Sequence, residues 1–274
     1  MKKGALIMPE LPEVETVRRT LENFVKNKRI RHVDVFYEKM ISNDVQSVLI
    51  GKTIEKIDRL GKYLIFNLGS HDLIVHLRME GRFFLKPYDE PRDKHEHVIF
   101  YLDDFTMRYH DTRKFGTFDL RIKEDTYKTP PLSLLAKDPF EIDANLFYER
   151  IKRKNQAIKT VLLDQKMILG LGNIYADETL FRSMIHPAKK ASTLTKKQTK
   201  LIIENAKDIL RESIALGGTT IRTYTSSLGV TGRFQHSLGV HQKLNEPCPN
   251  CQTLIEKKVI NGRSSFYCKT CQKR

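Results

Sequence analysis

The fold of the first part of the chain is decided by the stretch Met8-Pro9-Glu10-Leu11-Pro12-Glu13-Val14-Glu15. Proline suits the first turn of a helix because it has no N–H to leave unpaired, and acidic residues there complement the helix dipole. Apolar residues then recur at helical spacing through Val17, Leu21 and Val25. The pattern predicts a helix from about Leu11 to Lys26.

The same stretch has a second, chemical interpretation. If translation starts at Met8 and this residue is removed, Pro9 becomes the N-terminus and carries a secondary amine. An α-amino group titrates well below lysine, so much of it is unprotonated and nucleophilic near neutral pH. Such an amine attacks an aldehyde-like sugar carbon to form a Schiff base, and Glu10 places a carboxylic acid beside it. Inside a chain Pro9 is a tertiary amide that cannot react, so we expect residues 1–7 to be absent from the active form.

The net charge indicates a polyanionic partner. Among 274 residues, 48 are Lys or Arg and 33 are Asp or Glu, which gives a formal charge of +15. A solvated surface needs no such imbalance, so nucleic acid is the first expectation, ahead of an anionic membrane. No apolar run approaches the roughly 18 residues of a membrane span, and the apolar run before Met8 is too short for a signal peptide. We therefore expect a cytoplasmic protein.

Short strand-like segments fill the chain after the first helix. Their density is typical of a sandwich or flattened barrel. They cover about residues 29–37, 53–58, 62–68, 72–78, 82–86, 97–102, 105–110 and 116–122. We predict an N-terminal domain over residues 8–128, followed by a proline-bearing linker over 129–142.

Helical patterns dominate the second half. They cover about residues 143–153, 156–166, 174–184 and 195–216, and the last begins with a capping box of Thr195 and Gln198. Residues 217–235 are rich in Gly, Ser and Thr, which indicates a mobile loop. We predict a helical domain over residues 143–235 and a separate module over 240–274.

The four cysteines all lie in this last module. Cys248 and Cys251 form one Cys-x2-Cys pair, and Cys268 and Cys271 form another after 16 residues. This spacing fits a four-cysteine zinc site with a hairpin between the pairs. Two disulfides are the alternative, but nothing in the sequence indicates export. With four thiolate ligands no position stays open for water, so we predict one structural Zn²⁺.

Two close glycines precede a predicted helix in the stretch Ile168-Leu169-Gly170-Leu171-Gly172-Asn173-Ile174-Tyr175. As a dinucleotide-binding fingerprint it is weak, because a helix rather than a strand precedes it and the third glycine is missing. We favour a helix–turn–helix in which Asn173 caps the second helix and free N–H groups face a phosphate. A tight turn without a ligand is the alternative.

Two loops that follow predicted strands, at 76–81 and 111–116, carry apolar residues. Met79 and Phe115 are edge-of-core residues in one interpretation. In the other they are a wedge that enters a base stack, with Arg113 positioned to hydrogen-bond an orphaned base edge. Lys62 and Arg263 are either surface cations or, because glycines precede both, cations on tight turns that face a ligand.

Taken together, these residues resemble the formamidopyrimidine-DNA glycosylase family, bacterial enzymes that excise oxidised purines. The match runs from Met8 to the last cysteine pair, and its most specific elements are residues 8–15, 78–81, 172–175 and the zinc module with Arg263. The resemblance implies an α+β multidomain fold. Its parts are an N-terminal β-sandwich with an N-terminal helix, a helix-two-turn-helix domain and a four-cysteine zinc-finger β-hairpin.

The resemblance also implies catalytic roles. Pro9 would attack C1′ of the damaged nucleotide and Glu10 would act on the sugar oxygen as general acid or base. Lys62 would assist through contacts to phosphate and the damaged site, and Arg263 would bind phosphates beside the flipped nucleotide. β-Elimination and then δ-elimination would follow, so the implied enzyme is a bifunctional DNA glycosylase and AP lyase for 8-oxoguanine and formamidopyrimidines.

The implied DNA contacts lie along the whole chain. They comprise the void-filling residues Met79, Arg113 and Phe115, the phosphate contacts His95, Lys159 and Asn173, and Arg222 with Tyr224 in the loop over the flipped base. Damaged double-stranded DNA is the expected partner of a monomer that is associated with the bacterial nucleoid when bound.

Two departures from the family pattern stand out. His241-Gln242 replaces the usual Tyr-Gly, whose tyrosine is thought to help pack and orient the active-site end. Asn155 stands where a lysine is often found, which should weaken one phosphate contact.

Three other functions are compatible with parts of the sequence. An endonuclease VIII-like enzyme for oxidised pyrimidines uses a different wedge, so the set Met79, Arg113 and Phe115 favours the purine enzyme. A catalytically silent damaged-DNA binding protein would share the charge and the zinc module, and retention of residues 1–8 would produce one. A zinc-ribbon translation factor would explain the cysteines but not Pro9-Glu10.

Overall fold

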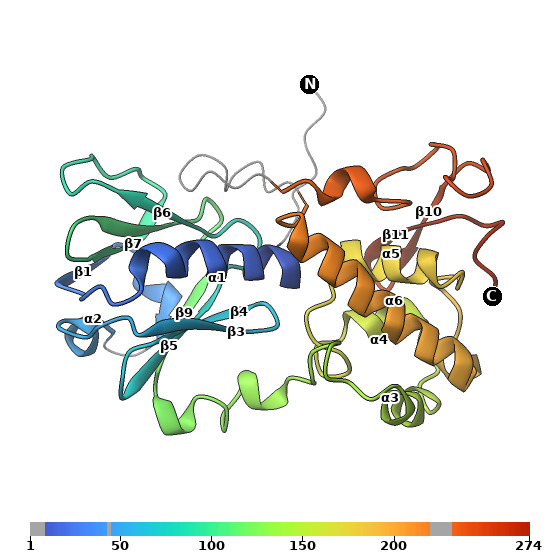
Figure 1. The fold of residues 1–274 in the computed structure, drawn as a ribbon, viewed down its shortest axis with the longest axis horizontal. Coiled ribbons are helices and arrows are strands. Elements are labelled where there is room, and N and C mark those ends of the chain that lie inside the picture. Colours follow the sequence, from blue (N-terminus) through green and yellow to red (C-terminus); the bar gives the residue numbers. More distant parts are fainter. Residues whose placement is uncertain (1–8, 43–44, 220–231) are drawn as a thin grey trace. The chain divides into compact units, whose positions relative to one another are not determined.

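The computed structural model describes residues 9–42, 45–219 and 232–274 (Figure 1). These residues form two compact units. The first comprises the chain up to Ser133 together with the segment from Gly217 to Gly232, and the second comprises Leu134–Leu216 and Arg233–Arg274. Three sets of residues named above lie outside the described parts: residues 1–7, which are expected to be absent from the active form, and the predicted DNA contacts Arg222 and Tyr224.

The first unit begins with helix α1, Leu11–Val25, which confirms the predicted helix to within one residue. Pro12 lies in its first turn, and Glu10 and Glu13 form a reciprocal capping box that pairs two otherwise orphaned N–H groups. The buried face of α1 includes Val14, Val17 and Leu21. This helix packs against strands β3 (Lys56–Leu60) and β4 (Tyr63–Asn67).

Two sheets make up the rest of this unit. The strands of the four-stranded sheet, in spatial order, are β1 (His32–Val35), β7 (Glu96–Tyr101), β8 (Thr106–His110) and β6 (Arg82–Lys86). Those of the five-stranded sheet are β2 (Ile41–Ser42), β9 (Thr117–Ile122), β5 (His71–His76), β4 and β3. All pairs are antiparallel except β2 with β9. Each of the eight predicted strand segments overlaps one of these strands, whereas β2 and the short helix α2 (Val45–Leu49) were not predicted.

Side chains of both sheets and of α1 form one buried cluster, so the predicted sandwich is confirmed. Aromatic rings fill its centre. Tyr109 is fully buried and meets Phe83 and Phe118 edge-on, with ring centroids 5.3 and 4.8 Å apart. Large rigid side chains of this kind fix the separation of the two sheets.

The second unit is helical, as predicted, with a terminal hairpin. Its helices are α3 (Ala144–Ile151), α4 (Ile158–Leu163), α5 (Asn173–Arg182) and α6 (Lys196–Ala215). The capping box predicted for α6 is present, because Thr195 Oγ1 accepts from Gln198 N and Gln198 Oε1 accepts from Thr195 N. Strands β10 (Glu256–Ile260) and β11 (Arg263–Tyr267) form the hairpin, and α5 packs against both α6 and β11.

Two details differ from the sequence prediction. The N-cap of α5 is Gly172 and not Asn173, which is the first helical residue and makes no capping bond. The described residues of the predicted 217–235 loop also divide between the units, since Gly217, Gly218 and Thr219 group with the N-terminal unit and not with the helical one. Within the described ranges, no helix is both long enough and apolar enough to cross a membrane.

Candidate functional site

The residues predicted to carry the chemistry lie at the start of α1. Pro9 is buried, and the Glu10 side chain is only 2% exposed. Glu10 is held as the N-cap residue, with its backbone N–H donating to Glu13 Oε2 at 3.0 Å. The capping box therefore fixes the backbone from which both Pro9 and the Glu10 carboxyl group extend.

Glu13 also binds the segment that precedes residue 220. Its Oε1 accepts from both the backbone N–H and the hydroxyl of Thr219, at 2.8 and 2.9 Å. Gly218 has a φ of +81°, and a Cβ at this position would lie 2.9 Å from Glu13 Oε1. Glycine is required here because the backbone is left-handed and passes close to a buried carboxylate. One side chain thus joins the Pro9-Glu10 end to the start of the predicted lesion-recognition loop.

Lys62 lies on the tight turn between β3 and β4, where Gly61 has a φ of 59°. The Lys62 side chain is buried, with 7% exposed. Arg59 supports the turn by donating to the Gly61 carbonyl at 3.0 Å and to Glu15 Oε2 at 2.9 Å. Helix α1 and the Lys62 turn are therefore connected through a single guanidinium group.

The Glu15 carboxylate at the centre of this connection is strongly ionised. Burial alone would raise its pKa, but hydrogen bonds from Arg18, Arg19 and Arg59 outweigh burial and lower the pKa to about 2. A permanently charged acceptor suits a structural clamp, because it keeps the arginines in place at any physiological pH.

The three predicted void-filling residues lie together. Arg113 Nη1 is 3.0 Å from Met79 Sδ, and the guanidinium carbon of Arg113 lies 4.7 Å from the centroid of the Phe115 ring. Phe115 is 49% exposed, although it is a large apolar side chain. The structure therefore brings side chains from two separate loops into one exposed cluster, which is a geometry that a wedge requires.

Hydrogen bonds to a buried carboxylate and close packing against a buried tyrosine fix the 111–116 loop. Asp111, which is fully buried, accepts N–H bonds from Arg113, Phe115 and Gly116, each at 2.9 Å. The Tyr109 hydroxyl occupies the space where Gly116 would carry a side chain, since an added Cβ would lie 1.7 Å from it.

The 76–81 loop is fixed by comparable contacts. An added Cβ at Gly81 would lie 1.9 Å from the same Tyr109 hydroxyl. Arg78 has a left-handed φ of 56°, and its N–H donates to His76 Nδ1 at 2.9 Å. Burial, together with the charges of Arg78 and Lys62, lowers the pKa of His76 to about 3. His76 is therefore neutral and free to accept this bond at physiological pH.

His95 immediately precedes β7 and is partly exposed. Its carbonyl accepts from Asp111 N at 3.0 Å, and its ring lies 5.5 Å from that of His110. His95 therefore adjoins the 111–116 loop. Its predicted contact is with a phosphate.

In the second unit, Asn173 begins α5 after a turn that Gln165 holds together. Gln165 Oε1 accepts from Gly170 N at 2.9 Å, and its Nε2 donates to the Leu171 carbonyl at 2.8 Å. Asn173 Oδ1 is buried and has no hydrogen-bond partner among the described residues. The amide is therefore not committed to a capping bond, unlike the sequence prediction.

Lys159, which was predicted to contact a phosphate, has partners inside the second unit. It lies on α4 and is fully buried, with its Nζ 2.7 Å from Asp177 Oδ1 and 2.8 Å from the Ser264 carbonyl. Lys159 therefore connects helices α4 and α5 with strand β11, and its contact to a phosphate stays a prediction.

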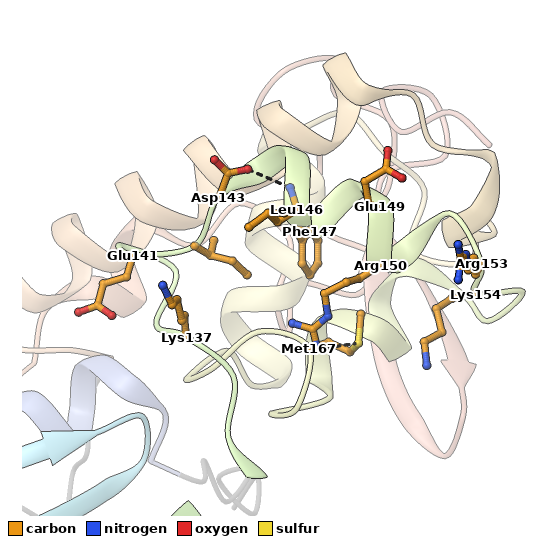
Figure 2. A pocket seen from close by; sticks show the side chains of 11 residues that line it. Lys137, Glu141, Asp143, Leu146, Phe147, Glu149, Arg150, Arg153, Lys154 and Met167 are labelled. Carbon is orange, nitrogen blue, oxygen red and sulfur yellow. Dashed lines mark hydrogen bonds between the residues drawn. The ribbon is translucent and has the colours of Figure 1, made fainter. Parts of the chain in front are cut away.

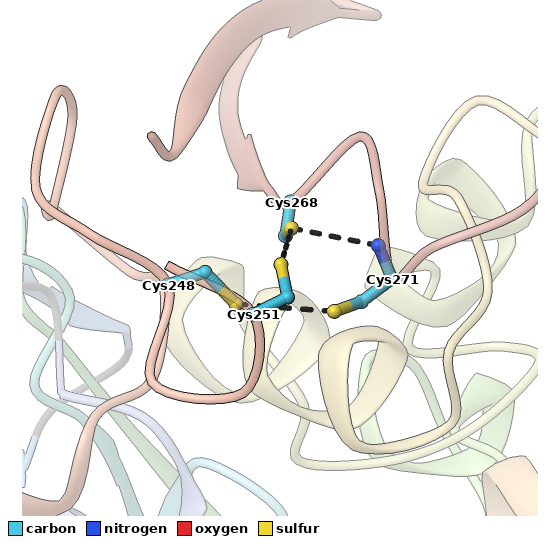
Figure 3. A group of neighbouring side chains, drawn as sticks. All are labelled: Cys248, Cys251, Cys268 and Cys271. Carbon is cyan, nitrogen blue, oxygen red and sulfur yellow. Dashed lines mark hydrogen bonds between the residues drawn. The ribbon is translucent and has the colours of Figure 1, made fainter. Parts of the chain in front are cut away.

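The four cysteines converge as predicted (Figure 3). Their sulfur atoms all lie within 4.8 Å of one another. The Cys248–Cys271 and Cys251–Cys268 sulfur pairs are 3.9 and 3.4 Å apart, close to the roughly 3.8 Å that a tetrahedral site with Zn–S bonds of about 2.3 Å requires. Hydrogen bonds from the side chain and backbone of Thr253 lower the pKa of Cys251 to about 6, whereas burial raises the pKa of Cys268 and Cys271. The residues fit one structural zinc ion.

The zinc module presents Arg263 at its tip. Asn261 and Gly262 form the two-residue turn between β10 and β11, with φ angles of 46° and 72°. Asn-Gly is the preferred pair for such a turn, because both positions need positive φ. Arg263 follows directly, is exposed, and has no ion-pair partner among the residues that the structure describes.

A cavity of about 920 Å³ lies elsewhere in the second unit, beside α3 (Figure 2). Arg150 extends toward Met167 along its wall and donates to the Lys166 carbonyl at 2.7 Å. Among the described residues, none of those predicted for catalysis or DNA binding lines this cavity. Its size therefore does not make it the reaction site.

Several supporting residues were not given roles from the sequence. Glu13 and Glu15 appeared only as residues of a helix start, and His76 and Asp111 only as neighbours of the loops. The three-residue spacing from Glu10 to Glu13 is a sequence signal for a capping box. Glu15 is spaced three and four residues from Arg18 and Arg19, which is the spacing of helical ion pairs. The contact of Glu15 with Arg59 joins distant segments and those of Asp111 depend on loop geometry, so the sequence carried no comparable signal for them.

Known proteins resemble this chain along its length. The description "Formamidopyrimidine-DNA glycosylase N-terminal domain" matches residues 8–118, "Formamidopyrimidine-DNA glycosylase H2TH domain" matches residues 135–225, and "Zinc finger found in FPG and IleRS" matches residues 245–274. The formamidopyrimidine-DNA glycosylase of Bacillus cereus is 47% identical over 275 residues, covering 97% of this chain and all of the relative. The Mycoplasma mobile enzyme of the same name is 45% identical, covering 97% and 99%.

Solved structures give the same result for the fold. Lactococcus lactis Fpg in complex with DNA containing an abasic site is 39% identical, with a TM-score of 0.93 over 97% of this chain and 100% of the other. MutM bound to DNA containing carbocyclic 8-oxo-G is also 39% identical, with a TM-score of 0.92 and the same coverage. Three domain matches in the expected order, full-length relatives and the shared fold lead to one conclusion: the chain belongs to the formamidopyrimidine-DNA glycosylase family.

Proposed function

We propose that this protein is a bifunctional DNA glycosylase and AP lyase, which removes 8-oxoguanine and formamidopyrimidines from duplex DNA and then cleaves the strand. The observation that carries the proposal is the exposed cluster of Met79, Arg113 and Phe115 in a member of this family. An enzyme that acts on C1′ must extrude the damaged nucleotide, and the space left in the duplex must be filled. Arg113 then reads the opposing cytosine, while Met79 and Phe115 occupy the stack.

The chemistry begins at Pro9. As an N-terminal amine, its nitrogen attacks C1′, and the bond from C1′ to the base breaks, so that the base leaves with the electron pair and takes up a proton. Glu10 acts on the sugar oxygen as general acid or base, which opens the ring and leaves a covalent iminium. Loss of a C2′ proton expels the 3′ phosphate, and a second elimination expels the 5′ phosphate. Water then hydrolyses the imine, which frees Pro9 and releases the unsaturated sugar fragment, and the DNA product is a one-nucleotide gap with phosphate at both ends.

The mechanism requires Pro9 to be the first residue of the active form. The family match begins at residue 8, directly before Pro9, which supports a start at Met8 followed by its removal. Intact-mass analysis of protein expressed from its native locus tests this requirement. A mature chain that still begins at Met1 contradicts the proline mechanism.

The remaining site residues act on phosphate. We propose that Lys62, His95, Asn173 and Arg263 contact the backbone around the extruded nucleotide, with Arg222 acting from the loop that lies outside the described residues. The bound zinc holds the hairpin that carries Arg263, and its four thiolates leave no position for water or substrate. Because phosphate contacts release counterions, we expect DNA affinity to fall steeply with salt; a flat salt response contradicts the proposed contacts.

The decisive experiment is borohydride trapping on a duplex that contains 8-oxoguanine opposite cytosine. Protein that starts at Pro9 is compared with protein that retains residues 1–8. A covalent adduct for the Pro9 form alone supports the proposal. Adduct from both forms indicates a lysine nucleophile, and tight binding without adduct from either indicates a catalytically silent binding protein.

Substrate choice separates the oxidised-purine enzyme from an endonuclease VIII-like enzyme. We expect excision of 8-oxoguanine to exceed that of thymine glycol, and the reverse order assigns the chain to the pyrimidine enzymes. Glu10→Gln should stall excision of 8-oxoguanine while DNA binding persists; normal turnover in this variant reassigns the acid. We further propose that the protein acts as a monomer in the cytoplasm and associates with the nucleoid through DNA.

A further inference from the structure

His241 stands where the resemblance leads us to expect a tyrosine, and the structure gives this histidine a specific partner. The His241 side chain is 5% exposed, so it belongs to the interior of the second unit. Its Nδ1 lies 2.8 Å from Asp177 Oδ2, and its ring meets that of Phe266 edge-on with centroids 5.3 Å apart. His241 therefore contacts both α5 and the zinc hairpin strand β11.

Asp177 is the centre of a buried polar cluster. Its Oδ1 pairs with Lys159 Nζ at 2.7 Å, and both side chains are fully buried. Its Oδ2 also accepts from Phe266 N, but at 3.3 Å, which is long beside the bond from His241. Lys159 in turn donates to the Ser264 carbonyl at 2.8 Å. Two backbone groups of β11 are thus bound to this cluster.

The backbone of His241 is itself fixed. Glu178, the neighbour of Asp177 on α5, accepts N–H bonds from Gly239, Val240 and His241 at 2.8, 3.0 and 2.8 Å. A Cβ on Gly239 would lie 2.5 Å from the Phe181 ring, so the chain packs closely against α5 here. The imidazole is consequently presented to Asp177 in one orientation.

We propose that His241 is a positioning residue for Arg263, acting through Asp177 and strand β11. Arg263 lies next to Ser264 and has no ion-pair partner among the described residues, so its location is set by the backbone of β11. Without the imidazole N–H, Asp177 Oδ2 keeps only the long bond from Phe266. The carboxylate can then turn toward Lys159, which breaks the bond from Phe266 N and frees the part of β11 that this bond holds. The proposal rests on the proposed function, because Arg263 matters only as a phosphate contact.

The test uses the full zinc-loaded chain starting at Pro9 and three variants. His241→Leu removes the donor, whereas His241→Asn keeps an N–H at the place of Nδ1. His236→Gln is the matched control, because His236 is an exposed histidine on the nearby short helix Phe234–Ser237. Cleavage is measured on an abasic-site duplex and on an 8-oxoguanine duplex, together with zinc content and hydrogen exchange of the β11 amides.

The expected result is a split between binding and turnover. For His241→Leu, KM for cleavage of the abasic duplex should rise about tenfold, since a displaced phosphate contact weakens substrate positioning, while zinc content stays at one per chain. Exchange of the β11 amides should become faster. His241→Asn should restore both readouts, and His236→Gln should leave them unchanged.

Two outcomes overturn the proposal. Wild-type kinetics and wild-type β11 exchange in His241→Leu show that the histidine does not position the strand. Equal losses in the Leu and Asn variants show that shape rather than the donated N–H matters. If His241→Leu loses zinc, the kinetics and β11 hydrogen exchange of His241→Asn alone test the proposal. Failure of the proposed function is distinct, because the unmodified chain would then give no cleavage of either duplex.

Discussion

Glu13→Gln is a sharp test of how the catalytic end is held. The substitution preserves shape and removes one acceptor oxygen from a fully buried group. The carboxylate accepts a hydrogen bond from Glu10 N on Oε2, and its Oε1 accepts from both the N–H and the hydroxyl of Thr219. A glutamine oxygen can serve only one of these sides. Because Thr219 supplies two donors, we expect the oxygen to stay there and the new NH₂ to face the Glu10 N–H.

The magnitude follows from these contacts. A buried N–H left without an acceptor costs about 1–3 kcal/mol, and the two remaining bonds lose the strengthening that a charged acceptor gives, about 1 kcal/mol more. We expect the free energy of unfolding of the first unit to fall by about 2–4 kcal/mol. For a unit of this size, that lowers the unfolding midpoint by about 5–15 °C. Borohydride trapping should fall as well, because the backbone that carries Pro9 and Glu10 is no longer fixed.

The assay is urea unfolding followed by circular dichroism, since the chain has no tryptophan. Glu124→Gln is the control, because it makes the same chemical change at an exposed residue. A change below about 0.5 kcal/mol in Glu13→Gln, which is the range of ordinary surface substitutions, refutes the argument that this carboxylate joins the two segments.

Three further predictions concern separate parts of the molecule. Because the folded pKa of Glu15 is about 2 against an ordinary 4.5, its stabilisation is present above pH 4.5 and is lost as the pH falls through about 2. Glu15→Gln should therefore lower the free energy of unfolding by roughly 2 kcal/mol at pH 7, a value reduced because the arginines are partly exposed, and by almost nothing near pH 2. An equal loss at both pH values in urea titrations argues against the clamp. Gly116→Ala should destabilise the first unit by about 1–3 kcal/mol because its Cβ would overlap the Tyr109 hydroxyl. Adding Tyr109→Phe should recover part of this loss relative to Tyr109→Phe alone, and strict additivity in the double-mutant cycle places the conflict elsewhere. Chelation of zinc or Cys268→Ser should abolish DNA binding in a gel-shift assay while the β-sheet signal of the first unit persists; binding that survives zinc loss shows that the hairpin is dispensable.

Local signals explain what the sequence predicted well. The start of α1, the capping box of α6 and the Asn261-Gly262 turn depend on residues within four positions of each other. Paired Cys-x2-Cys spacing likewise predicts its own metal site. Such features require no knowledge of the tertiary fold, so a single sequence contains them.

Contacts between distant segments explain what it missed. The resemblance gave Lys159 only a contact to phosphate, and the structure adds its buried partners Asp177 and Ser264. Nothing near Lys159 in the sequence indicates these partners. The resemblance correctly grouped Met79 with Arg113 and Phe115, yet the residues that shape their loops, Tyr109 and Asp111, emerge only from the packing.

The three N–H bonds accepted by Asp111 have a consequence for how damage would be found. Because these bonds lie within the protein, they fix the 111–116 loop before DNA binding, and the loop then loses little conformational entropy on binding. If Phe115 and its neighbours enter the stack as proposed, they do so as a rigid tip. The barrier to insertion then lies in the DNA, in the work of unstacking each base pair. Insertion should therefore be faster at a base pair whose stacking a lesion has weakened. This difference in rate arises before the protein contacts any atom of the damaged base.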